Sequence, residues 1–307
     1  MSEDRQHSND YIRYDEFMKK ILTEFSNVEF HQILQGMYNS RTFVLKGFNN
    51  KDKKYYVHKL FPIDFKEDAL DYNTLPVHTV KNKLMNLDHP NIMKMTDFSG
   101  EYNFNKQGPG FGYIISIFYE GITGQEFMNK NNPKNNLSML LNLGLGIFYM
   151  HENNLSHGDI KSENLIVSND GKQAIIIDNE LNSKKNHELN MPFGTVVIAP
   201  PEQVFDNKNK ITPTTDTFSF GQLICKALNP LKFLQERCFY QNNTMSTCKL
   251  MKSSDFPDNW INLIVTKSFS DFKELLNQML QPDHNDRIGF RDGFDQLEKI
   301  VYDHFKK

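Results

Sequence analysis

The sequence predicts an α+β fold in which a smaller β-rich part precedes a larger helical part. Short runs of aromatic and β-branched residues, broken by turn residues, fill the segment from about 28 to 120. After Gly121, apolar residues recur at helical spacing. The chain has 307 residues, of which 38% are hydrophobic and 24% charged, so it can bury a sizeable core as two folding units or one large domain. The order of a β-rich part and a helical part favours two lobes with a cleft between them.

The β-rich part is preceded by an extension over residues 1–27. Within it, apolar positions from Tyr14 to Phe25 fall on one face of an expected amphipathic helix over 11–25. Strands are then expected at the runs FHQIL, TFVLKGF, KKYYVHKLF and YIISIF. One helix over about 74–87 interrupts them and ends before His89-Pro90, because proline disfavours further helix.

The second part, residues 121–307, begins with the buried helix MLLNLGLGIFYMH. The run ENLIVSNDGKQAIIID predicts a hairpin that turns at Asp170-Gly171. Helices are expected at FSFGQLICKAL, FKELLNQML and FDQLEKIVYDHF. The polar stretch from about 229 to 258 is interpreted as an irregular insertion between helices.

Composition excludes several classes of protein. The formal net charge is −3, so neither nucleic acid nor an anionic membrane is an expected partner. The apolar runs are shorter than the roughly 20 residues of a membrane-spanning helix. The polar start is unlike a signal peptide, and three cysteines without a C-x-x-C pair argue against disulfides or zinc. We therefore expect an intracellular, cytoplasmic protein, and its oligomeric state is left open.

The segment HGDIKSEN carries the chemistry. Together with Asp178 after the hairpin, it supplies three acid or amide groups, Asp159, Asn164 and Asp178. Two of these could ligate Mg²⁺ through oxygen. The third could accept a hydroxyl proton, and Lys161 could neutralise charge on a transferring phosphoryl group.

In these residues the chain resembles the eukaryotic-type protein kinase family. HGDIKSEN looks like H-R-D-x-K-x-x-N, DNE stands where D-F-G is expected, and YVHK matches V-A-I-K. The segments GTVVIAPPE and DTFSFG resemble the G-T-x-x-Y-x-A-P-E and D-x-W-S-x-G motifs. The resemblance covers about residues 30–305 and implies a bilobal fold, with a small β-rich N-lobe over 28–120 and a larger helical C-lobe over 121–307.

The resemblance also implies roles for individual residues. Asp159 would be the catalytic base and Lys161 its catalytic partner, while Asn164 and Asp178 would bind the metal. Contacts to ATP are expected from one residue set: Gly36, Phe43, Val57, Lys59, Ile117, Tyr119 and Ile166. Ser116 falls at the gatekeeper position. His157 would brace the loop, and Glu202 with Arg287 would form a buried structural ion pair.

Four departures from the family pattern affect this interpretation. Only Gly36 of the glycine-rich loop is present, so side chains hinder close approach of the backbone to phosphates. Val80 stands where the helix glutamate that pairs with Lys59 is expected. Gly158 replaces the arginine of H-R-D, and Asn179-Glu180 replaces Phe-Gly of D-F-G. Glu180 is a hypothetical substitute partner for Lys59; the alternative is that Glu180 points to solvent and Lys59 pairs with Asp178 until ATP arrives.

The expected function is therefore transfer of the γ-phosphoryl group of ATP, with Mg²⁺, to Ser or Thr hydroxyls of a protein substrate. The lysine two residues after the base favours a serine/threonine kinase. Two alternatives remain open at this point: a pseudokinase that binds nucleotide or acts as a scaffold, and a small-molecule kinase of the aminoglycoside or choline type.

Overall fold

A computed structural model describes residues 23, 25–35, 43–63, 85–102, 110–178, 183–184, 188–189, 199–205, 209–242, 253 and 255–306. The chain divides into two compact units. Residues 1–72 and 95–118 form the sheet unit, and residues 73–94 and 119–307 form the helical unit. The helices expected over 11–25 and 74–87 lie almost wholly outside the described residues.

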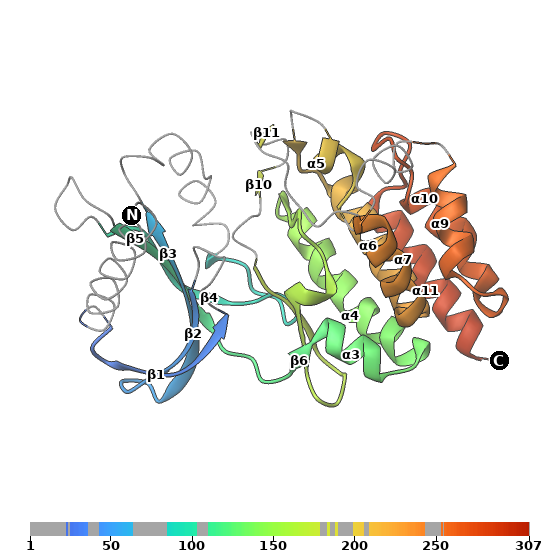
Figure 1. The fold of residues 1–307 in the computed structure, drawn as a ribbon. Coiled ribbons are helices and arrows are strands. Elements are labelled where there is room, and N and C mark those ends of the chain that lie inside the picture. Colours follow the sequence, from blue (N-terminus) through green and yellow to red (C-terminus); the bar gives the residue numbers. More distant parts are fainter. Residues whose placement is uncertain are drawn as a thin grey trace, which may run out of the picture. The chain divides into compact units, whose positions relative to one another are not determined.

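The described part of the sheet unit contains a five-stranded antiparallel sheet in the order β1-β2-β3-β5-β4 (Figure 1). Its strands are β1 (Val28–Gln35), β2 (Phe43–Asn49), β3 (Lys54–Ile63), β4 (Met95–Tyr102) and β5 (Gly110–Ile117). The four strands expected from the sequence are confirmed as β1, β2, β3 and β5. Strand β4 was not expected, because Asp97, Ser99 and Gly100 interrupt its apolar pattern.

Alternation along β3 gives the sheet two different faces. Val57 and Lys59 lie on one face, where Ser116 and Ile114 of β5 stand directly opposite them. His58 lies on the other face and is only 2% exposed. The rings of Phe25 and Phe30 meet the His58 ring edge-on, with centroids 5.1 and 5.2 Å away. Burial among these groups lowers the pKa of His58 to about 4.

Most of the described part of the helical unit is α-helix. Its helices are α3 (Gly124–Lys130), α4 (Pro133–Glu152), α5 (Pro201–Phe205), α6 (Pro213–Leu228), α7 (Pro230–Asn242), α9 (Phe256–Ile264), α10 (Lys273–Met279) and α11 (Phe290–Lys306). A 3-10 segment over Lys267–Phe272 precedes α10. The helices expected within α4, α6, α10 and α11 are confirmed.

Helix α6 is the core of this unit. Every residue from Thr215 to Leu228 is buried, because α4, α7, α9, α10 and α11 all pack on it (Figure 1). Its start is set by the side chain of Thr212, which accepts a hydrogen bond from the backbone N–H of Thr215, and by Pro213 in the first turn. Residues placed on α6 are therefore held rigidly inside the unit.

Short strands complete the helical unit. The expected hairpin is confirmed: β8 (Leu165–Val167) pairs with β9 (Ala174–Ile176), and β6 (Ile122–Thr123) adds to β8. Gly171 in its turn has a φ of +71°, which glycine tolerates. Two further pairs join β7 (Leu155–Ser156) to β10 (Ser183–Lys184) and β11 (Glu188–Leu189) to β12 (Asn209–Lys210).

The interpretation of residues 229–258 as irregular was wrong for its first half, where α7 forms. Asn229 accepts a hydrogen bond from the N–H of Lys232, and Pro230 suits the first turn of a helix. Phe233 is buried and meets Trp260 of α9 edge-on at 5.7 Å. Tertiary packing of this one aromatic side chain stabilises a helix whose apolar periodicity is weak.

Of the helices that the structure describes, none combines the length and the apolar character needed to cross a bilayer.

Candidate active site

Three of the residues expected to carry chemistry meet in one turn between β7 and β8. The Oδ2 atom of Asp159 accepts a 2.6 Å hydrogen bond from Lys161 Nζ and a 3.0 Å bond from Asn164 Nδ2. The same amide of Asn164 also donates to the backbone carbonyl of Asp159 at 2.9 Å. Asp159 and Lys161 are 12% and 22% exposed, so both can still be reached from solvent. We call residues 157–164 the catalytic turn.

Asp216 of α6 holds the backbone at the start of the catalytic turn. Its two carboxylate oxygens accept 2.8 Å hydrogen bonds from the backbone N–H groups of His157 and Gly158. His151 Nε2 contacts the same carboxylate at 2.8 Å, and Asp216 is fully buried. Gln203 Nε2 donates to the carbonyl of Gly158 at 2.8 Å. Polar side chains therefore provide the hydrogen bonds that the backbone N–H and C=O groups of this loop do not obtain from a sheet or a helix.

His157 connects the turn to the end of the hairpin. Its Nδ1 accepts from the backbone N–H of Asp159 at 3.1 Å, which leaves Nε2 to donate to the carbonyl of Ile177 at 3.0 Å. The ring is completely buried. The bracing role expected for His157 fits these contacts.

Gly158 stands where the family pattern has arginine, and its surroundings suit glycine. Its φ is +79°, a left-handed conformation that side chains rarely adopt. A Cβ atom at this position would lie 2.7 Å from the Cδ1 atom of Ile211. Backbone conformation and close packing both favour the residue that the sequence supplies.

Asp178 reaches the site through the hairpin. Leu165 pairs with Ile176, and the N–H of Ile177 donates to the carbonyl of Asn164 at 2.9 Å. Asn164 therefore stands opposite Ile177 at the base of the hairpin, and Asp178 is the next residue along the chain. Asp178 has a φ of +61°, a left-handed conformation that is uncommon outside glycine but that aspartate adopts more readily than most residues.

Asn164 and Asp178 have the donor chemistry that Mg²⁺ requires. The Nδ2 atom of Asn164 is used by Asp159, so its Oδ1 is the atom that can face a cation, and Asp178 supplies a carboxylate. Within the described ranges, no group of three or more His, Cys, Asp or Glu side chains could hold a metal ion by itself. One carboxylate and one amide suit Mg²⁺, which usually takes its other ligands from phosphates and water.

The expected nucleotide contacts are distributed over both units. Val57 and Lys59 share one face of β3, with Val57 paired to the expected gatekeeper Ser116. Ile117 ends β5, and Ile166 lies in the middle of β8. Tyr119 is the first residue of the helical unit after β5, and its hydroxyl accepts a 3.1 Å hydrogen bond from the N–H of Lys94.

Several expected positions are outside the described residues. Gly36 is among them, as are Val80 and Glu180, so the hypothetical partnership of Glu180 with Lys59 stays a prediction. Phe43 begins β2, but only its backbone is described.

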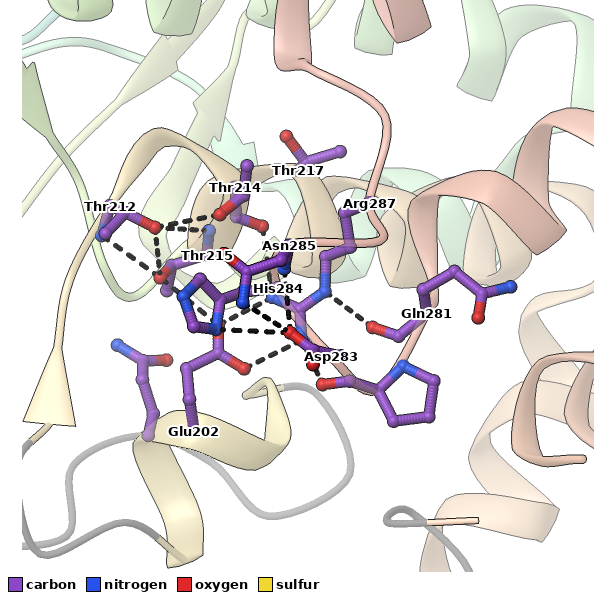
Figure 2. Close-up of polar contacts among 12 residues, drawn as sticks. Glu202, Thr212, Thr214, Thr215, Thr217, Gln281, Asp283, His284, Asn285 and Arg287 are labelled. Atoms are coloured by element: carbon purple, nitrogen blue, oxygen red, sulfur yellow. Dashed lines mark hydrogen bonds and ion pairs between the residues drawn. The ribbon is translucent and has the colours of Figure 1, made fainter. Parts of the chain in front are cut away.

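The ion pair expected between Glu202 and Arg287 is confirmed (Figure 2). Arg287 donates from Nη1 and Nη2 to the two carboxylate oxygens of Glu202 at 2.6 and 2.7 Å. The guanidinium also donates to the carbonyls of Gln281 and Pro282, and it lies 4.9 Å from the ring centroid of Phe218. This two-point contact joins α5 to the loop before α11 and has a structural role.

Sequence reasoning gave no role to three polar residues that hold the turn, of which Gln203 and Lys226 are buried and His151 is partly buried. Gln203 donates to the carbonyl of Gly158 in the turn, and His151 contacts Asp216, which holds the turn. Lys226 of α6 donates to Ser162 within the turn. Lys226 alone gave a usable signal, because it is a charged residue inside the apolar run FSFGQLICKAL.

The antiparallel sheet, the helical unit and the braced turn are together the architecture of a protein kinase. A family model described as "Protein kinase domain" matches residues 32–297. The chain therefore belongs to the protein kinase family, whose members generally use ATP and Mg²⁺ and act on protein substrates.

Individual relatives agree with this family. The chain is 30% identical over 217 residues to calcium-dependent protein kinase 6 of Plasmodium berghei, a match that covers 67% of this chain and 13% of that protein. It is 28% identical over 172 residues to the inhibitor of nuclear factor kappa-B kinase subunit alpha of Gallus gallus, covering 49% and 22%. It is 27% identical over 148 residues to the serine/threonine-protein kinase PrkC of Bacillus subtilis, covering 46% and 22%. The matches thus span less than a quarter of each relative.

Proposed function

We propose that this chain is an active serine/threonine protein kinase that transfers the γ-phosphoryl group of ATP to a protein hydroxyl. The observation that carries the proposal is the contact of Lys161 Nζ and Asn164 Nδ2 with the same oxygen of Asp159. An acid, a cation and an amide held within hydrogen-bond reach form a preorganised site for phosphoryl transfer.

Asp159 is the proposed base. Its carboxylate orients the substrate hydroxyl and accepts the hydroxyl proton as the new O–P bond forms and the bond to ADP breaks. Lys161, already 2.6 Å from this carboxylate, offsets the charge that develops on the transferring group.

Asn164 Oδ1 and the Asp178 carboxylate are the proposed metal ligands, and Lys59 is the proposed contact of the α- and β-phosphates. Bound Mg²⁺ supplies neutralisation of the phosphate charge. The lysine at position 161 and the serine/threonine kinases among the relatives support the choice of hydroxyl substrate.

A nucleotide-binding pseudokinase is the second candidate. It is favoured by the absence of the second and third glycines of the loop that begins at Gly36, and by Val80 in place of the helix glutamate. A small-molecule kinase is disfavoured, since families of that class lack the segment GTVVIAPPE, which ends at Glu202, and the helix that begins with DTFSFG.

The test measures transfer of radiolabelled phosphate from ATP with Mg²⁺ to a degenerate library of Ser-, Thr- and Tyr-containing peptides. We expect label on Ser and Thr peptides, its loss in Asp159→Asn with ATP binding retained, and its loss in Asp178→Asn with folding retained. Thermal-shift titration with ATP, with and without Mg²⁺, monitors binding. Binding without any transfer would establish the pseudokinase, and full activity in either variant would overturn the mechanism.

A further inference from the structure

Lys226 is a buried charge that the proposed reaction does not use. It is 1% exposed and is one of the largest fully buried side chains of the described residues. Removing an ammonium group from water is costly unless hydrogen bonds and an opposite charge compensate it. A lysine buried on a helix therefore costs stability. Because of this cost, the contacts that Lys226 makes indicate what it does.

Those contacts lead into the catalytic turn. Lys226 Nζ donates to Ser162 Oγ at 2.5 Å, and Ser162 Oγ donates in turn to Glu163 Oε2 at 2.6 Å. These two contacts keep the ammonium nitrogen no more than about 5 Å from the carboxylate oxygen of Glu163. We call this chain of contacts the lysine relay.

The segment that the lysine relay holds is weak by itself. Ser162–Asn164 is a single turn of 3-10 helix, and its N-cap residue Lys161 makes no side-chain capping bond. Isolated turns of this kind have little intrinsic stability, so their geometry depends on outside anchors. Asn164, at the end of this turn, donates to Asp159 and is one of the two proposed metal ligands.

Helix α6 therefore forms hydrogen bonds with the catalytic turn at two places. Asp216, near its start, holds the backbone of His157 and Gly158, and Lys226, near its end, holds Ser162. Ten residues separate the two anchors, which is about 15 Å along a helix axis. The first anchor fixes the entry to the turn and the second fixes its exit.

We propose that Lys226 is a positioning residue, which acts through Ser162 and Glu163 to hold Asn164 against Asp159. Its effect on turnover rests on the proposed kinase activity, whereas its effect on the geometry of the turn does not. The ammonium also compensates the Glu163 carboxylate, so that this second acid does not compete with Asp159 for Lys161.

The test compares Lys226→Met and Ser162→Ala, singly and together, with Gln222→Met. Gln222 is the matched control, because it is fully buried on the same helix and its Oε1 accepts a 2.8 Å hydrogen bond from Trp260 Nε1 of α9 instead of contacting the turn. The first two variants cut the lysine relay at different atoms, and Ser162→Ala does so with the loss of one atom.

We expect kcat to fall about tenfold in Lys226→Met, the Mg²⁺ concentration for half-maximal rate to rise several-fold, and the KM for peptide to stay within twofold. The double variant should be no worse than Lys226→Met alone, because both changes break one unit. Gln222→Met should lower the urea midpoint by a comparable amount without any change in these kinetic constants.

Hydrogen exchange separates this inference from the proposed function. In Lys226→Met and Ser162→Ala, the amide of Asn164, which donates to the carbonyl of Lys161, should exchange at least tenfold faster than in Gln222→Met. If the wild type transfers no phosphate, the kinase proposal fails and the exchange rates still decide this one. If Lys226→Met does not fold, Ser162→Ala decides. Exchange and kinetics equal to those of Gln222→Met would overturn the inference.

Discussion

Asp216 and Gly158 are joined by a 2.8 Å hydrogen bond from the backbone N–H of Gly158 to Asp216 Oδ1, across 58 positions of sequence. The bond is buried, and it fixes a glycine whose φ is +79°. It links the most deeply buried helix of the unit to the backbone that carries Asp159. Position of the proposed base is thus decided by a residue that does not touch it.

Replacing Asp216 by alanine should destabilise the helical unit. The change leaves the N–H groups of His157 and Gly158 buried without an acceptor, which should lower the free energy of unfolding by about 3 kcal/mol. Trp260 is the single tryptophan and is buried in this unit, so its fluorescence during urea denaturation reports the change. Asp295→Asn, at an exposed site on α11, is the control and should move the midpoint little. Equal midpoints for the two variants would refute the bracing role.

Sequence patterns predicted most of the fold because its elements have clear local signals. Strand β3 is rich in aromatic and β-branched residues and α11 keeps an apolar stripe, so both could be found locally. Strand β4 lacks such a run and was missed. For the site, the order of the motifs along the chain predicted Asp159, Asn164 and Asp178 as candidate functional residues.

The supports of the site were harder to predict. The contacts of Gln203 with Gly158 and of Lys226 with Ser162 span 45 and 64 positions, and no local pattern encodes them. The positive φ of Gly158 and its approach to Ile211 likewise follow from tertiary packing.

Alanine at position 158 should destabilise the catalytic turn. The left-handed backbone and the 2.7 Å approach of a new Cβ to Ile211 should together cost about 1–3 kcal/mol of unfolding free energy. Gly289→Ala is a matched control, since its nearest neighbour would be 3.7 Å from the new Cβ. Urea denaturation followed by Trp260 fluorescence should separate the two substitutions. A Gly158→Ala protein as stable as Gly289→Ala would show that the backbone here is not restrictive.

Glu202 and Arg287 should behave as one unit. Breaking this buried pair from either side should lower the free energy of unfolding by about 3–5 kcal/mol, because the remaining charge stays buried without its partner. In a double-mutant cycle of Glu202→Gln and Arg287→Met, the double variant should lose much less than the sum of the single losses. Arg287→Lys should not restore stability, since lysine cannot form the two parallel bonds. Additive losses would show that the two side chains are not coupled through the contacts that Figure 2 shows.

The proposed activity should not depend on phosphorylation between Asp178 and Glu202. This interval contains two hydroxyl residues, Ser183 and Thr195, and Gly158 supplies no guanidinium to bind a phosphate there. Phosphatase-treated protein should therefore transfer phosphate to peptide within about twofold of the untreated rate, a difference that matters little on the scale of an activating phosphate contact. A large loss on treatment, restored when Ser183 is phosphorylated again, would reject this expectation.

Acid should weaken the sheet unit through His58. Its ring is buried between Phe25 and Phe30 and, among the described residues, neither ring nitrogen has a hydrogen-bond partner. Burial lowers its pKa to about 4, whereas an unfolded histidine keeps a pKa of about 6.5. The unfolded state therefore binds a proton first as the pH falls. This stabilisation is complete above pH 6.5 and is lost between about pH 6.5 and 4, by an amount on the order of 3 kcal/mol.

Substitution of His58 by phenylalanine should remove this part of the pH dependence. We expect the wild type to lose more stability than His58→Phe between pH 7.5 and pH 5, as measured by urea denaturation followed by circular dichroism. His284→Gln is the control, because His284 is nearly half exposed and its change should leave the pH dependence as it is. Above pH 7 the histidine and phenylalanine rings differ mainly in shape, so a constant difference in unfolding free energy there reports packing. The change of that difference below pH 7 reports protonation of His58. Parallel curves for wild type and His58→Phe would show that His58 does not link protonation to unfolding.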